Sequence, residues 1–98
     1  MLDIQKTVKT VAAFSLAGRL DTITAPQLEN ALRDVFDNVD EVVFDLADLS
    51  YISSAGLRVL LSARKAMAQK GEVTLRHVNE SILELINVTG FSEFLTIE

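Results

Sequence analysis

Residues 42–57 read VVFDLADLSYISSAGL and hold the sharpest change of pattern in the chain. Val42 to Phe44 form an unalternating apolar run, which predicts a short buried strand near the centre of a partly parallel sheet. The serines at 53 and 54 are typical helix-start residues and precede an apolar helical pattern, so a helix is predicted from about 55 to 70. Residues 46–54 are expected to be irregular.

The predicted helix over 55–70 has one narrow polar stripe, and the rest of its surface is a broad apolar arc. The stripe consists of Arg58, Ser62, Lys65 and Gln69. The arc fits either the core or a homodimer interface, and both interpretations stay open. Arg64 falls inside it, where its stem can pack while its guanidinium reaches water, or contact a partner. Gly71 is placed to end the helix in a left-handed conformation.

The amino-terminal half predicts a hairpin followed by a helix. Residues 2–8 alternate as in an edge strand, and residues 11–17 are almost entirely apolar, as in a strand covered on both faces. The Gly18–Asp21 segment breaks this pattern. Thr24 and Gln27 then have the spacing of a capping box, with Pro26 between them, and predict a helix that ends before Asn38.

The carboxy-terminal part predicts a strand over 73–76, a helix capped by Asn79 and stopped by Gly90, and a last strand or docked tail over 91–97. The whole chain is 98 residues long, which suits one domain with its own core, residues 1–98. The element order predicts an α/β fold, a mixed sheet of about four to five strands with three to four packed helices.

Composition excludes several classes of function. The net charge is −5 without a run of lysine or arginine, which disfavours nucleic acid and anionic membranes and favours a neutral or basic protein partner. There is no cysteine and one histidine, which excludes thiol catalysis and clustered zinc ligands, so no metal or cofactor is expected. No run of 18 apolar residues and no leader-like apolar segment occurs, so we expect a soluble cytoplasmic protein.

Few side chains follow a pattern that indicates catalysis or ligand binding. Ser53 and Ser54 lie at a predicted helix start, where backbone amides favour a phosphate; phosphorylation, phosphate binding and plain capping all fit these residues. His77 alternates with Leu75 and has no partnered serine or carboxylate pattern, which favours a structural histidine. The four glycines are dispersed, so no phosphate-cradling loop is present. The chain is therefore not expected to be an enzyme.

The segment 45–57, the Gly18–Asp21 segment and the element order resemble the STAS family, which includes anti-sigma factor antagonists. The resemblance covers essentially the whole chain and implies the STAS fold. In those antagonists a short Asp-Ser-Ser/Thr-Gly-Leu motif opens the second helix, and its first serine is phosphorylated by the anti-sigma factor, a protein kinase. The resemblance places the phosphoacceptor at Ser54, with Gly56 and Leu57 matching the motif. Ser53 stands in place of the aspartate.

The resemblance implies a partner-switching function. The unphosphorylated form would bind a cognate anti-sigma serine kinase and free a sigma factor, phosphorylation of Ser54 would end binding, and a serine phosphatase would restore it. Because Ser53 replaces the aspartate, phosphorylation at Ser54 could also be weaker, shifted to Ser53 or absent. Ala55 removes a neighbouring acceptor.

Two further points stay open from the resemblance. It places Asp21 near the phosphoacceptor on the partner-binding surface, but an acid that only forms a turn fits equally. It also allows another function, a constitutive STAS-like subunit of a lipid-transport or stressosome-like complex. We expect a monomer rather than a homodimer, and no direct contact with nucleic acid or membrane.

Overall fold

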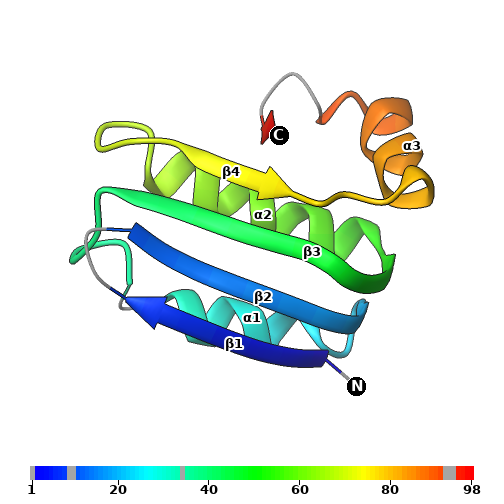
Figure 1. The fold of residues 1–98 in the computed structure, drawn as a ribbon, viewed down its shortest axis with the longest axis horizontal. Helices are drawn as coiled ribbons and strands as arrows, with labels where there is room; N and C mark the ends of the chain where they lie inside the picture. The colour runs from blue at the N-terminus through cyan, green and yellow to red at the C-terminus, as the bar shows by residue number, and fades with distance from the viewer. Residues whose placement is uncertain (1, 9–10, 34, 92–94) are drawn as a thin grey trace.

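The computed structural model describes residues 2–8, 11–33, 35–91 and 95–98. Five strands and three helices occur in these ranges (Figure 1). In chain order they are β1 (Leu2–Val8), β2 (Val11–Leu20), α1 (Ala25–Leu32), β3 (Glu41–Ile52), α2 (Ser54–Ala66), β4 (Val73–Arg76), α3 (Glu80–Thr89) and β5 (Thr96–Ile97).

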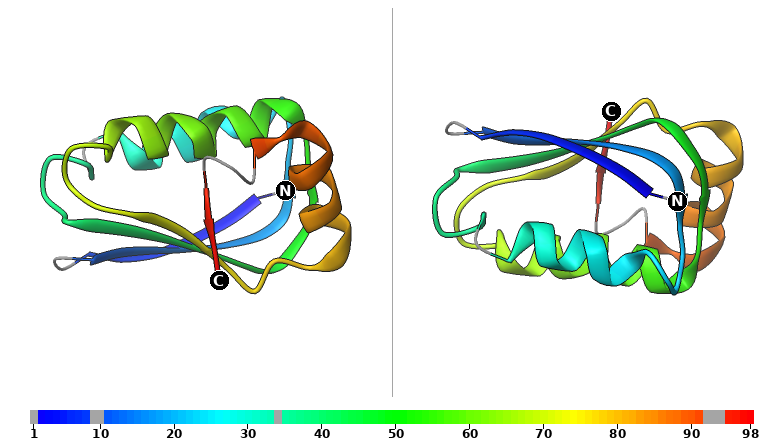
Figure 2. Two further views of the ribbon diagram at one scale, coloured as in Figure 1. Left: turned by 90° about the horizontal axis from the view of Figure 1, so that it is seen from above. Right: turned by 90° about the horizontal axis from the view of Figure 1, so that it is seen from below.

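The strands form one mixed sheet in the order β1-β2-β3-β4-β5. β1 is antiparallel to β2, and β2 to β5 are parallel to one another. The predictions of an amino-terminal hairpin and a central third strand are confirmed. Residues 91–97 were expected to form a last strand or a docked tail; Thr96–Ile97 form a strand, and residues 92–94 lie outside the described ranges. In both views of Figure 2, α1 and α2 lie on one side of the sheet, while α3 lies beyond one end. This arrangement confirms the predicted α/β fold.

The sheet is covered on one face only by the described helices, and here one prediction was wrong. Residues 11–17 were expected to be buried on both faces, yet burial alternates along β2. Ala12, Phe14 and Leu16 are buried, whereas Ala13 between them is exposed. The residues on the open side are small, so their hydrophobicity does not require a second covering layer.

The prediction that residues 46–54 are irregular was also wrong, because β3 continues to Ile52. Its pairing with β2 shifts register twice, between Ser15 and Ala17 and between Gly18 and Arg19. These irregularities put the buried residues of β3 three positions apart, at Leu46, Leu49 and Ile52. A spacing of three hides the period of two by which a strand is normally recognised.

The core lies between the sheet and α1 and α2. The rings of Phe14 and Phe44, on adjacent strands, are tilted and 5.7 Å apart between centroids. The apolar arc of α2 faces this core and supplies buried residues, namely Leu57, Val59, Leu60 and Ala63, and Met67 directly after the helix is buried as well. Arg64 is exposed. The interpretation of the arc as core is thereby confirmed.

The ends of α1 and α2 depart from the prediction, and α2 stops at Ala66 instead of near residue 70. α1 ends at Leu32 and not just before Asn38, and turns follow in which the Val35 amide donates to the Leu32 carbonyl. Val35 is buried, so its apolar side chain fits the helical pattern without being in the helix. α3 agrees with prediction: Asn79 Oδ1 accepts the Ile82 amide at 2.9 Å, and Gly90 ends the helix in a left-handed conformation.

Gly71 follows α2 for a different reason from the one predicted. α2 ends at Ala66, and the described glycines with positive φ are Gly18 and Gly90, so Gly71 is no left-handed cap. A Cβ atom at Gly71 would lie 1.9 Å from the Asp40 carbonyl oxygen. Glycine is required here because two backbone segments approach closely.

We expect Gly71→Ala to destabilise the protein by about 1 to 3 kcal/mol, because backbone must move to admit the methyl group. Urea unfolding followed by circular dichroism measures this loss. The exposed neighbour provides the control, since Glu72→Ala should change stability by less than about 0.5 kcal/mol. Equal stability of the two variants would show that the approach of Asp40 is not a constraint.

Candidate functional site

The two serines predicted at a helix start have different roles at the amino terminus of α2. Ser53 is the N-cap, in an extended conformation, and its Oγ accepts the Gly56 amide at 3.3 Å. Ser54 is the first residue of the helix, and its side chain is exposed. Within the described residues, no protein group is hydrogen-bonded to the Ser54 hydroxyl. The free hydroxyl is therefore that of Ser54.

Gly56 and Leu57 hold this helix start against the sheet. A Cβ atom at Gly56 would lie 2.7 Å from Leu20 Cγ, 2.9 Å from the Leu20 carbonyl oxygen and 3.0 Å from Ile52 Cγ1. Leu57 is only 2% exposed and belongs to the core. The Ser53 amide donates to the Leu20 carbonyl at 2.9 Å. Both motif residues are thus buried packing residues, and Ser54 alone of the Ser54–Leu57 segment presents a free polar group.

Asp21 organises the turn between β2 and α1. Its Oδ1 accepts the Ile23 and Thr24 amides, each at 3.0 Å, and the Thr24 hydroxyl at 3.2 Å. The Thr24 hydroxyl also donates to the Arg19 carbonyl at 2.8 Å. Its oxygen accepts the Asp21 amide, also at 2.8 Å. The predicted capping of α1 by the Thr24 side chain does not occur, because its oxygen is used within this turn.

These hydrogen bonds hold the pKa of Asp21 below its ordinary value of 3.8. The backbone amide of Thr24 is the main cause, followed among the lowering contributions by the amide of Ile23, the hydroxyl of Thr24 and the charge of Arg19. An ionised carboxylate is a better acceptor than a neutral acid, so donors around it favour the charged form. The turn-forming interpretation of Asp21 accounts for its geometry.

The turn and the start of α2 lie at the same end of the sheet, where the chain leaves β2 and β3 (Figure 1). Beside them, the Arg19 guanidinium stacks over the Tyr51 ring at 4.2 Å from its centroid. The Ser50 hydroxyl donates to the Gly18 carbonyl at 2.8 Å. These cross-strand contacts join the ends of β2 and β3 into one surface.

For His77, the expectation of no carboxylate partner was wrong. This histidine follows β4 with φ of 55°, is exposed, and its Nδ1 lies 3.1 Å from Asp45 Oδ1. The pKa of Asp45 is lowered, chiefly by the Ala47 amide and further by the side chain of His77. Across the described ranges, no three His, Asp or Glu side chains are grouped to hold a metal ion. No described helix has the length and hydrophobicity needed to cross a bilayer.

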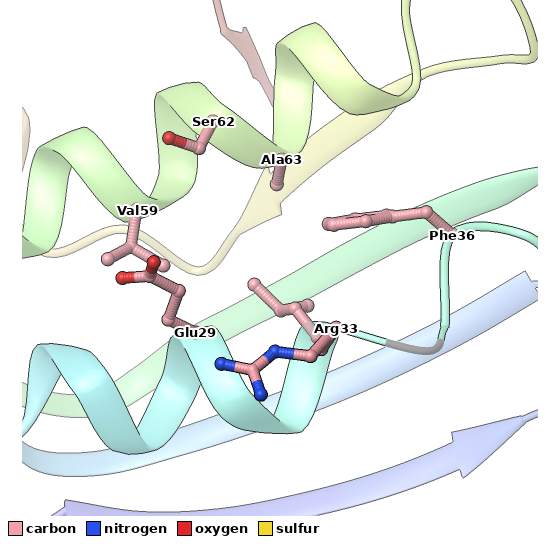
Figure 3. Close-up of a pocket in the computed structure, with 7 residues that line it drawn as sticks. Glu29, Arg33, Phe36, Val59, Ser62 and Ala63 are labelled. Carbon is pink, nitrogen blue, oxygen red and sulfur yellow. The ribbon is translucent and has the colours of Figure 1, made fainter.

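A groove of about 200 Å³ separates α1 from α2 (Figure 3). Glu29 on α1 and Arg33 directly after it face Val59, Ser62 and Ala63 on α2, and Phe36 lies at one end. The Arg33 guanidinium is already bonded to Asn30 Oδ1 at 2.8 Å. The groove contains none of the residues predicted to form the site.

A family model described as the STAS domain matches residues 3–98. The chain belongs to the STAS domain family. An anti-sigma-B factor antagonist from Listeria monocytogenes is 33% identical over 86 residues, an alignment that covers 85% of this chain and 75% of the relative. Such antagonists are regulatory binding proteins, so the expectation that this STAS domain is not an enzyme is confirmed.

Solved structures agree on the fold. An anti-sigma factor antagonist from Mycobacterium paratuberculosis matches this STAS domain with a TM-score of 0.90 at 22% identity, covering 99% of this chain and 85% of that one. SpoIIAA matches in its unphosphorylated form with a TM-score of 0.77 at 16% identity, covering 100% and 87%. Its phosphorylated form matches with a TM-score of 0.76 at 15% identity, covering 100% and 91%.

The family resemblance placed Asp21 near Ser54, and the structure brings both to the same end of the sheet, together with Gly56 and Leu57. The sequence analysis did not predict the hydrogen bonds of Asp21 within the turn between β2 and α1, or the exposure of Ile23. The spacing of Asp21 and Thr24 carried a signal for this turn, since aspartate side chains commonly bond to amides two and three residues on. That pattern competed with the capping box assigned to Thr24 and Gln27.

Asp21→Asn tests the charge in the turn, because asparagine keeps an acceptor oxygen at the same place. The pKa of Asp21 is lowered on folding, so the carboxylate stabilises the folded state above its ordinary value of 3.8. This contribution is lost as the pH falls through the lower, folded pKa. We expect Asp21→Asn to be less stable than the parent at pH 7 and equally stable in strong acid.

Chemical denaturation between pH 7 and pH 2 measures the effect. Asp37→Asn is the matched control, since this exposed aspartate lies in the turns after α1, at the other end of that helix. A stability difference for Asp21→Asn that does not change with pH would assign the effect to altered geometry and not to charge.

Proposed function

We propose that residues 1–98 form a single cytoplasmic STAS domain that acts as an anti-sigma factor antagonist by partner switching. The unphosphorylated protein binds an anti-sigma serine kinase and thereby frees a sigma factor. Phosphorylation of Ser54 ends this binding, and a serine phosphatase restores it. The observation that carries the proposal is the exposed, unbonded Ser54 hydroxyl on the first residue of α2.

Three features favour Ser54 over its neighbours as the acceptor. The Ser53 hydroxyl already caps the helix through the Gly56 amide, so its modification would remove a cap. Ala55 has no hydroxyl. A kinase needs an accessible nucleophile on a surface it can approach, and Ser54 alone provides one in this turn.

Phosphorylation should leave the domain folded. A phosphate at Ser54 adds about −1.5 to −2 charges at neutral pH. The amino terminus of α2 carries a partial positive charge, and a negative group there is worth about 0.3 to 1 kcal/mol of stabilisation. The switch must therefore act on the interface with the partner and not on the fold.

The interface is sensitive to such a charge. A dianion placed against an acidic or apolar partner surface suffers repulsion and loses its hydration. A cost of about 2 to 3 kcal/mol already weakens binding by tens to hundreds of times. Gly56 and Leu57 support this mechanism by fixing the helix start, so that the added phosphate stays at the contact surface.

The binding test uses Ser54→Ala and Ser54→Asp as baits in native lysate, with bound proteins quantified by mass spectrometry. We expect a kinase-like protein to be enriched on Ser54→Ala and depleted at least tenfold on Ser54→Asp. Ser81→Asp is the matched control, because it adds the same charge to an exposed serine in the first turn of α3.

Ser81→Asp should retain the partner. Equal recovery of one stable complex on every bait would contradict the switch and identify a constitutive subunit of a larger assembly. Loss of the partner on both aspartate variants would show that net charge, and not the position of Ser54, controls binding.

Ser54→Asp should also preserve or slightly raise stability, by about 0.3 to 1 kcal/mol, because its carboxylate lies at the positive end of α2. Urea unfolding and amide hydrogen exchange of α2 measure this. Ser53→Ala provides the contrast, since loss of the cap should cost about 0.5 to 2 kcal/mol. Increased exchange throughout α2 in Ser54→Asp would show that the charge acts by unfolding the helix.

A further inference from the structure

The groove between α1 and α2 has an apolar wall and room for part of a ligand. Ser62 and Ala63 are small, so they leave space where larger side chains would fill the contact between the helices. The rest of the apolar wall consists of Leu32, Phe36 and Val59. The volume of about 200 Å³ exceeds the roughly 150 Å³ of an apolar cavity that accommodates a benzene ring. The groove can therefore hold one branched or aromatic side chain of a small molecule.

The end of the groove near Phe36 is held in place by the turns after α1. The Val35 amide donates to the Leu32 carbonyl at 3.0 Å, and the Asn38 amide donates to the Val35 carbonyl, also at 3.0 Å. Lys70 Nζ donates to the Phe36 carbonyl and so links these turns to the segment after α2. A groove that is already formed does not have to be ordered by its ligand, which lowers the entropic cost of binding.

Two opposite charges lie at the rim of the groove without pairing with each other. Glu29 and Arg33 are four residues apart, the spacing at which a glutamate and a following basic residue attract each other on a helix. Among the described residues, the Glu29 carboxylate has no ion pair or hydrogen bond. Arg33 donates to Asn30 Oδ1 at 2.8 Å, but this amide is neutral and leaves the guanidinium charge uncompensated. The rim therefore presents one carboxylate and one guanidinium that can each take a charged partner.

These two charges favour a ligand that carries both signs. A simple cation would be repelled by Arg33, and a simple anion would be repelled by Glu29. A zwitterion avoids both costs, since its ammonium can face Glu29 while its carboxylate accepts N–H groups of Arg33. The bond to Asn30 leaves further N–H groups of the guanidinium available for this. Charge and shape together indicate a small molecule with an ammonium, a carboxylate and an apolar body.

We propose that the groove between α1 and α2 is a binding site for an apolar α-amino acid in its zwitterionic form. Glu29 binds the ammonium, and Arg33 binds the carboxylate. The apolar side chain of the ligand lies against Leu32, Phe36 and Val59. The bound amino acid joins α1 to α2 and stabilises the folded state increasingly as its concentration rises. The inference does not rest on the proposed function, because none of the site residues at the start of α2 lines the groove.

The test is a titration of the full chain with phenylalanine and with leucine, followed by two-dimensional NMR of the backbone amides. We expect shifts at the groove residues and a dissociation constant of about 1 mM or tighter for at least one of the two amino acids. N-acetylphenylalanine lacks the ammonium, phenylalanine amide lacks the carboxylate, and alanine lacks the large apolar body. Each of these compounds should bind about fivefold more weakly or worse.

Variants of the rim and of the wall locate the ligand. Glu29→Gln and Arg33→Gln should each weaken binding of the tighter amino acid about fivefold and keep the parental unfolding midpoint. Glu84→Gln is the matched control, since Glu84 is an exposed glutamate inside α3, and it should leave the affinity unchanged. Ser62→Leu places a bulky side chain at an exposed position of the groove and should reduce binding below detection.

The absence of shifts with either amino acid at about 10 mM would overturn the site, as would shifts confined to residues outside the groove. Equal binding of the acetylated and amidated compounds would overturn the assignment of a zwitterion and identify an apolar cavity without selection for charge. Unchanged affinities in Glu29→Gln and Arg33→Gln would do the same. These measurements use the chain without a partner protein, so their failure leaves the switch at Ser54 standing, and failure of the switch leaves the groove site standing.

Discussion

The first turn of α2 packs directly against the ends of β2 and β3, and there is no room for a side chain at Gly56. Leu20 and Ile52 close this contact from the two strands, and the Ser53 amide bonds to the Leu20 carbonyl. Two strands and one helix are thereby held together through the Leu20 carbonyl and the buried side chains of Leu20 and Ile52. The contact with the Leu20 carbonyl involves backbone, so it can adjust only if whole elements move.

The position of Ser54 follows from this contact. Gly56 lets the start of α2 pack closely against the sheet. The Ser53 hydroxyl accepts the Gly56 amide, which would otherwise lack a partner, and the Ser54 hydroxyl is left exposed. Under the proposed function, a phosphate there changes the charge of this surface without unfolding the helix start. This separation of a rigid support from an exposed acceptor suits a binding switch better than a site whose backbone reorders.

The turn beside this helix start shows the same separation. The carboxylate of Asp21 and the hydroxyl of Thr24 satisfy the polar groups of the turn from within, so the turn is fixed without a partner. Arg19 is likewise engaged, since it pairs with Asp21 and lies over the Tyr51 ring. The side chain of Ile23 is left exposed beside them.

The local patterns of the sequence determined the amino-terminal hairpin, the central strand, the caps of α3 and the two-sided character of α2, because each depends on residues close together in the chain. Only the tertiary structure decided the length of β3, the open face of β2 and the role of Gly71. Each of these depends on a neighbour distant in sequence: the shifted register with β2, the side on which the helices pack, and the Asp40 carbonyl. The same holds for the site, where the serines were readable locally but the exposure of Ile23 and the internal bonding of Asp21 required the folded turn.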